Sequence, residues 1–64
     1  MKMIVATAQE WQKQCLQYAQ AGEDFMVTGY LASDLQFLRN LGVFYNYAWG
    51  ETTSAVFFRW MGKV

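Results

Sequence analysis

The chain offers few side chains that could carry out chemistry. Its 64 residues include one cysteine, five carboxylates and no histidine. Cys15 is the candidate nucleophile, but a thiol needs a base or a positive neighbour to become a thiolate, and histidine is the usual base. The spacing of Cys15 with Trp11 and Ala19 places it on the apolar side of a predicted helix. We therefore interpret Cys15 as a buried core residue.

The carboxylates are scattered along the chain. Glu23 and Asp24 form an adjacent pair, and they follow Gly22, which is typical of a helix end. A glycosidase-like acid and base would require carboxylates brought together from distant positions, and no spacing indicates this. One cysteine without histidine does not make a zinc site, and the glycines form neither a phosphate loop nor a dinucleotide motif. We therefore expect no enzymatic activity, no metal and no cofactor.

Aromatic side chains make up 19% of the chain and concentrate in its last third. Aromatic rings stack on single-stranded nucleic acids, but such platforms alternate with lysine or arginine, which are sparse here. Tyrosine, tryptophan and arginine are also the residues enriched at protein–protein hot spots. We therefore predict a partner-binding surface on these side chains. Its predicted residues are Tyr45, Tyr47, Trp49, Phe57 and Trp60, with Arg59 beside them and Gln36, Arg39 and Asn40 as a polar rim.

Length and charge limit the class of protein. We expect residues 1–64 to form a single compact domain, and a domain of this size buries only about 60% of its unfolded surface. Small chains are usually stabilised by disulfides, a metal or oligomerisation, and the single cysteine leaves oligomerisation or a tight partner. The formal net charge is zero, which argues against a nucleic acid as partner, because that binding draws on phosphate neutralisation.

Hydropathy and cysteine content suggest a location. The longest uncharged stretch, residues 40–50, is about half of the roughly 20 residues that a membrane helix needs. The N-terminal apolar run is too short for the core of a signal peptide. A lone cysteine fits a reducing compartment. We therefore expect a cytoplasmic protein without a membrane partner, in the host cytoplasm if a phage encodes it.

The first third of the chain predicts one helix. Thr7 and Glu10 have the spacing of a capping box, in which each side chain bonds the other residue's backbone amide. Gly22 is a natural C-terminal stop. These signals predict a helix over residues 8–20. The preceding residues 3–5 are compatible with a short strand.

The middle third predicts a second helix. Ser33 and Gln36 form a weaker capping box, and leucines recur at helical spacing until Gly42. These signals predict a helix over residues 33–41. Residues 23–32 mix strand-like and helix-like spacing, and either a short strand or a helical turn is acceptable there.

The last third predicts a β-hairpin. Residues 43–49 and 53–60 are β-branched and aromatic, and residues 50–51, Gly-Glu, provide a two-residue turn. A two-residue turn would place Trp49 opposite Thr52, and a three-residue loop would shift the pairing by one. The expected fold class is α+β, with two short α-helices packed on a C-terminal antiparallel β-hairpin.

Alternation sorts the side chains of the hairpin into two faces. One face carries Val43, Tyr45, Tyr47, Trp49, Val56, Phe58 and Trp60. The other carries Phe44, Asn46, Ala48, Ala55, Phe57 and Arg59. Both faces hold large apolar groups, and two short helices bury only one of them well. The second face is therefore a candidate interface.

The order of helix, short element, helix and hairpin resembles a winged helix over residues 25–61. Residues 38–44, with the pattern Leu-x-x-Leu-Gly-Val-Phe, look like a recognition helix that runs into the first wing strand. The resemblance implies that Gln36, Arg39 and Asn40 would face the major groove of DNA. Helix and wing together offer only two arginines as cations, so phosphate contacts would be few.

In format the chain also resembles the small accessory proteins of phages and mobile elements, including anti-CRISPR proteins. That resemblance implies an inhibitor that docks on and blocks a larger host complex, such as a CRISPR effector. Our leading hypothesis is therefore a non-enzymatic protein-binding module whose partner is a larger host protein or complex. The alternatives are a winged-helix DNA-binding transcriptional regulator and a small structural homo-oligomer subunit, and a homodimer is compatible with the sequence.

Overall fold

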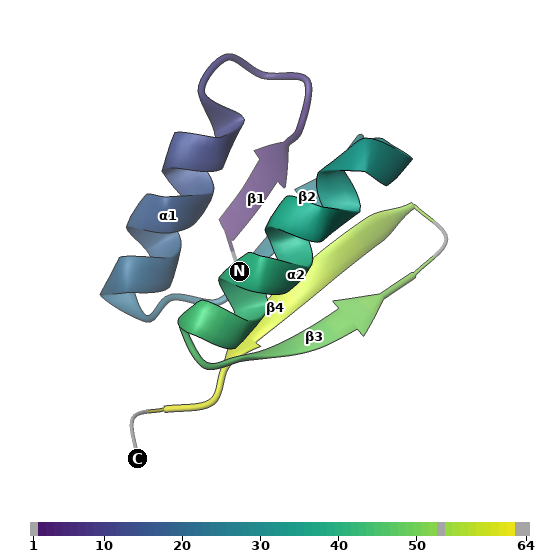
Figure 1. Ribbon diagram of the computed structural model, residues 1–64. Helices are drawn as coiled ribbons and strands as arrows, with labels where there is room; N and C mark the ends of the chain where they lie inside the picture. Colours follow the sequence, from purple (N-terminus) through teal and green to yellow (C-terminus); the bar gives the residue numbers. More distant parts are fainter. Residues whose placement is uncertain (1, 53, 63–64) are drawn as a thin grey trace.

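The computed structural model describes residues 2–52 and 54–62 as two helices on a four-stranded mixed sheet (Figure 1). In chain order the elements are β1 (Lys2–Val5), α1 (Trp11–Ala21), β2 (Phe25–Thr28), the 3₁₀ turn η1 (Ala32–Asp34), α2 (Leu35–Phe44), β3 (Tyr47–Glu51) and β4 (Ala55–Trp60). The expected α+β class is confirmed. The sheet is larger than the predicted hairpin, because β1 and β2 extend it.

The sheet joins the two halves of the chain in the order β1-β2-β4-β3. β1 and β2 are parallel, so the chain needs a crossover between them, and α1 supplies it. β4 runs antiparallel to both β2 and β3. Figure 1 shows α1 and α2 on the same side of the sheet, so its other face is left without a covering helix in the described part of the chain.

The core lies between the helices and the inner face of the sheet. Phe25 and Phe58 are register partners on β2 and β4, and their rings stack with centroids 4.7 Å apart. Tyr47 and Trp49 of β3 meet Phe58 edge-on, as aromatic pairs prefer. The buried cluster consists of Ile4, Cys15, Ala19, Phe25, Val27, Leu38, Leu41, Tyr47, Val56 and Phe58.

Helix α1 begins three residues later than predicted, at Trp11. The predicted capping box is wrong: Glu10 occupies the N-cap position with a left-handed φ of 59°, and no side chain caps the helix. Residues 6–10 instead form turns between β1 and α1, anchored by a bond from the Ala6 amide to the Thr28 carbonyl. The chain must connect β1 to α1, so Thr7 and the other residues of the predicted capping box lie in these turns and not at the start of the helix. The predicted stop at Gly22 is confirmed.

The start of the second helix also differs from the prediction. Residues 32–34 form the 3₁₀ turn, and α2 follows from Leu35. The cap is not the predicted pair of Ser33 and Gln36. The carboxylate of Asp34 accepts a hydrogen bond of 2.9 Å from the amide of Leu31 and so fixes the entry to the turn.

Helix α2 continues past Gly42 to Phe44, beyond the predicted end at residue 41. Gly42 is buried within the helix, and a Cβ there would lie 3.4 Å from the ring of Phe58. Gly42 therefore does not end the helix, and the space between it and the Phe58 ring would accept a methyl group. The left-handed residue that follows the helix is Asn46, with φ 60°.

The hairpin is confirmed, but its predicted register is wrong. Trp49 lies opposite Phe58 rather than Thr52, and the turn falls after Glu51. Both the amide and the hydroxyl of Thr52 bond to the backbone of Ala55, which closes the turn. Thr53, the predicted first residue of the second strand, lies outside the described residues. Val43 and its neighbour belong to α2 instead of the first strand.

Although the predicted register is wrong, the predicted division of side chains between the two faces is correct for the residues that lie in strands. Relative to the prediction, each residue of β3 faces a partner six positions further along β4. Because the side-chain period of a strand is two, an even shift keeps every side chain on its face. Gly50, predicted as a turn residue, lies within β3 opposite Phe57.

The helix-turn-helix unit of a winged helix is not present in the described residues. Such a unit joins two helices by a turn of about 3–4 residues. Here the strand β2 and η1 lie between α1 and α2. Of the two alternatives left open for residues 23–32, the structure has the strand: β2 is central in the sheet, and its Phe25 and Val27 point into the core in alternation.

We expect Gly42→Ala to raise the free energy of unfolding by about 0.5–1 kcal/mol, because alanine favours a helix and its methyl group would make an ordinary contact. Urea denaturation of both proteins measures this. A loss of stability would indicate that the added methyl group crowds the ring of Phe58 instead of packing against it.

Candidate functional site

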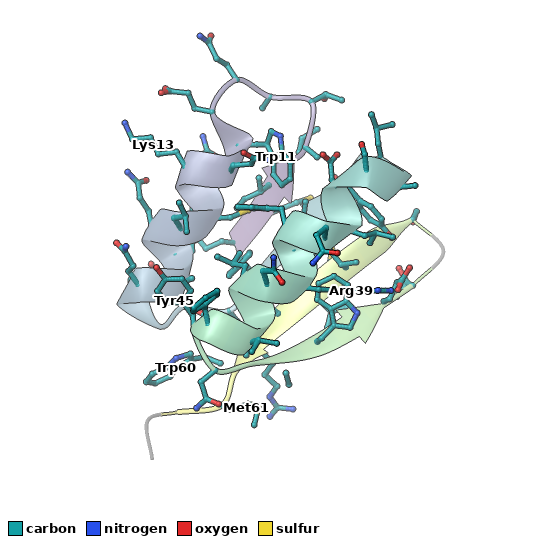
Figure 2. The ribbon with its side chains drawn as sticks, viewed as in Figure 1. Trp11, Lys13, Arg39, Tyr45, Trp60 and Met61 are labelled. Carbon is teal, nitrogen blue, oxygen red and sulfur yellow. The ribbon has the colours of Figure 1, made fainter. Side chains whose placement is uncertain are left out.

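A hollow of about 710 Å³ lies where the ends of α1, α2 and β4 come together. Its walls are the end of α1 through Gly22, the segment from Phe44 to Asn46 and the side of Trp60. Figure 2 shows Tyr45 and Trp60 at this same end of the molecule. We call this feature the helix-end hollow. No charged side chain from the described residues lines it.

A second, narrower groove continues from the hollow between the two helices. It has a volume of about 310 Å³ and is lined by Leu16, Phe37 and Leu41. Phe44 and Tyr45 line both spaces, so the two form one apolar surface. Phe44 is 83% exposed, which is unusual for a large apolar side chain that has a core within reach. This surface is the strongest candidate for a contact with another molecule.

The wall formed by Trp60 is fixed by its neighbours. Gly22 ends α1 with a φ of 73°, and a Cβ there would approach the indole ring to 3.2 Å. The ring therefore rests on the backbone of Gly22, where only glycine leaves this space. The amide of Trp60 donates a hydrogen bond of 2.8 Å to the Asp24 carboxylate. The first contact places the ring, and the second fixes the backbone that carries it.

Asn46 fixes the opposite wall. Its left-handed backbone turns the chain from α2 into β3, a conformation that asparagine tolerates better than most residues. Its side-chain amide donates to the carbonyl of Gly62, and its own carbonyl accepts from the amide of Met61 at 3.0 Å. Residues 61–62 are thereby tied to the end of α2.

Tyr47, a predicted hot spot, is a core residue. It is 6% exposed, and its hydroxyl donates a hydrogen bond of 2.7 Å to the carbonyl of Glu23 and lies 3.2 Å from that of Tyr18. Burial, together with the charges of Asp24 and Glu23, raises the pKa of Tyr47 to about 12. Its side chain links β3 to the end of α1 and is not available to a partner.

The other predicted residues are divided between two sides of the molecule. Trp49 packs against Phe58 and shares a shallow groove with Arg39. Gln36 donates a hydrogen bond of 3.3 Å to Asn40 on the exposed side of α2, and Asn40 borders the groove between the helices. The predicted residues near the hollow are therefore Tyr45, Trp60 and Asn40.

Phe57 and Arg59 lie on the opposite face of the sheet. They alternate along β4 with the inward-facing Phe58, so they point away from the helices. Arg59 and Arg39 are thus on opposite sides of the molecule. The two arginines do not combine into the basic surface that a nucleic acid would need.

Phe44 is a site residue that sequence reasoning missed. We assigned it to the second face of a strand, because it stands in an aromatic and β-branched run. Phe37, Leu41 and Phe44 are spaced by four and three residues, and this spacing is the signal of a helical stripe that would have identified it.

The described residues offer little for catalysis. Cys15 is fully buried, and this burial raises the pKa of its thiol to about 12, so it stays protonated at neutral pH. No group of three or more metal-ligating side chains gathers within residues 2–52 and 54–62. Over the same residues, neither helix has the length and apolar character needed to cross a membrane.

Comparison of the chain with protein-family models, with curated proteins and with solved structures gave no match. The geometry of the chain itself therefore carries the functional argument.

We expect Tyr47→Phe to lower the free energy of unfolding by about 1–2 kcal/mol at neutral pH, because the carbonyl of Glu23 loses its donor. The pKa of Tyr47 is raised in the folded state, so its contribution is complete below about pH 10 and is lost as pH rises through about 12. Urea denaturation from pH 7 to pH 11.5 should show the two stabilities converging. If the free energies of unfolding of the two proteins instead differ by the same amount at every pH, this role of the Tyr47 hydroxyl is contradicted. Ionisation of Cys15 affects both proteins equally and does not alter the comparison.

Proposed function

We propose that the chain is a non-enzymatic protein-binding module whose binding site is the helix-end hollow and the adjoining groove. The observation that carries this proposal is the exposure of Phe44 beside a hollow whose wall, Trp60, is already fixed. Exposed aromatic groups around a preformed concavity are typical of protein contacts.

The lining indicates the chemistry of the contacting group. Gln20 and Asn46 contribute neutral polar groups, and the rest of the hollow is apolar or glycine. A charged group placed there would lose its hydration without gaining an ion pair. An apolar side chain, presented on a helix or an extended segment of another protein, would gain contact with Phe44, Tyr45 and Trp60. The neutral Gln36–Asn40 pair would then lie at the rim.

Preformed walls favour affinity. Ordering a long side chain during binding costs about 0.5–1.5 kcal/mol. The indole of Trp60 already lies against Gly22, and the side chain of Asn46 is hydrogen-bonded to Gly62, so this cost falls mainly on Phe44. The partner's apolar side chain therefore meets a surface that changes little.

Our proposal extends to the mode of action. A module of this size acts on a larger complex by occupying one of its surfaces. Inhibition of a host complex by such docking, as the resemblance to phage accessory proteins implies, is the role that we propose for it.

A displayed library of random 12-residue peptides, selected on the immobilised wild-type protein, tests the site. We expect the selected peptides to share apolar anchors, and we expect Phe44→Ala to weaken their binding at least about 30-fold, because hot-spot residues contribute about 2 kcal/mol or more. Tyr45→Ala should act in the same direction.

Leu31→Ala is the matched control. Leu31 is 68% exposed, lies before η1 and does not line the hollow, so its truncation removes a comparable apolar group elsewhere. Circular dichroism should show both variants folded, because neither side chain is in the core. If Phe44→Ala and Leu31→Ala bind the selected peptides equally well, the hollow is not the binding site.

A further inference from the structure

The face of the sheet that the helices leave uncovered has an apolar surface of its own, which we call the open face. Met3, Met26 and Phe57 lie side by side across β1, β2 and β4 in the strand register. Gly50 of β3 completes this row. Met3 is 65% exposed, and Phe57 is half-buried although no helix covers it.

Along the edge strand β3, the open face is formed at Gly50 by the ring of Phe57. A Cβ at Gly50 would collide with the ring of Phe57, so the ring lies across β3 above the glycine. This arrangement covers the backbone of the glycine with an aromatic group. Met26, beside the ring, has a flexible thioether that adapts to an opposing surface.

Charge restricts what this surface would bind. Arg59 is the single ionic side chain that alternation places on the open face within the described strands. Asp24, which precedes β2, is engaged by the amide of Trp60. An anionic membrane or a nucleic acid would require several cations, and a charged protein surface would require opposite charges. An apolar surface with a single cation is best matched by a surface of the same kind.

We propose that the open face binds the open face of a second copy of the chain, in a dimer with two-fold symmetry. Two sheets pack face to face about 10 Å apart, with their inner side chains interdigitated. A two-fold dimer buries the same patch on both copies, and the zero net charge of the chain creates no overall repulsion. Arg59, near the end of β4, would remain at the rim in contact with water.

The area of the open face fits a weak dimer. Four strands about 4.8 Å apart and about 17 Å long define a face of roughly 19 by 17 Å. Two such faces have a planar area of about 650 Å², and the accessible surface of their projecting side chains brings the buried area toward the roughly 1,000 Å² that is the lower limit for a specific interface. The dimer would also add the apolar burial that a chain of this length lacks. We therefore infer an association that depends on protein concentration in the micromolar range.

Sedimentation equilibrium from about 10 μM to about 1 mM, a range that spans weak interfaces, tests the proposal. We expect the average mass of the wild type to rise from that of one chain toward that of two. The double variant Met3→Glu, Ala48→Glu places a carboxylate on each edge of the open face and should weaken the dimer at least tenfold. Both positions are exposed, so the fold should be retained, and circular dichroism would verify this.

The matched control is Leu31→Glu, Val43→Glu, which adds the same two charges at exposed apolar positions away from the open face. It should dimerise like the wild type. A single-chain mass for the wild type at the highest concentration would overturn the proposal, as would equal dimerisation of the two double variants. In a mixture of differently labelled copies, intermolecular NOEs between the Met26 methyl group and the Phe57 ring should report the contact directly.

Discussion

The stacked rings of Phe25 and Phe58 are the contact on which the rest of the structure depends. They stand opposite each other on β2 and β4, the two central strands, and thereby join the N-terminal and C-terminal halves of the chain. Tyr47 and Trp49 pack edge-on against Phe58, and Gly42 of α2 lies beside the same ring. The position of both helix ends, and hence of the helix-end hollow, follows from this cluster.

The two apolar surfaces of the protein have different origins. The helix-end hollow is concave because two left-handed residues, Gly22 and Asn46, turn the chain away from the helices at neighbouring points. The open face is uncovered because both helices lie on the other side of the sheet and the described residues hold no further element to cover it. The two surfaces are made of different residues on different sides of the molecule, so the two proposals are independent of each other.

The sequence predicted the class of the fold and the ends that depend on local chemistry. Gly22 ends α1 because a left-handed backbone favours glycine. Local signals failed where a distant contact decides the outcome. Gly42 and Gly50 have the appearance of a stop and a turn, but each faces an aromatic ring that belongs to β4, Phe58 and Phe57. Of the candidate site, Tyr45, Trp60 and Asn40 were predicted, whereas Phe44 was hidden by a wrong helix end.

The strand order has a consequence for how the chain reaches its folded state. β3 and β4 are adjacent in sequence, so their pairing closes a short loop at little entropic cost. The central pairing of β2 with β4 joins residues separated by about 30 positions, and such long-range closure slows folding. The hairpin of β3 and β4 can therefore form first, but it buries few apolar groups before β2 pairs with β4. Neither half of the chain is a folding unit, and folding is complete only when Phe25 reaches Phe58.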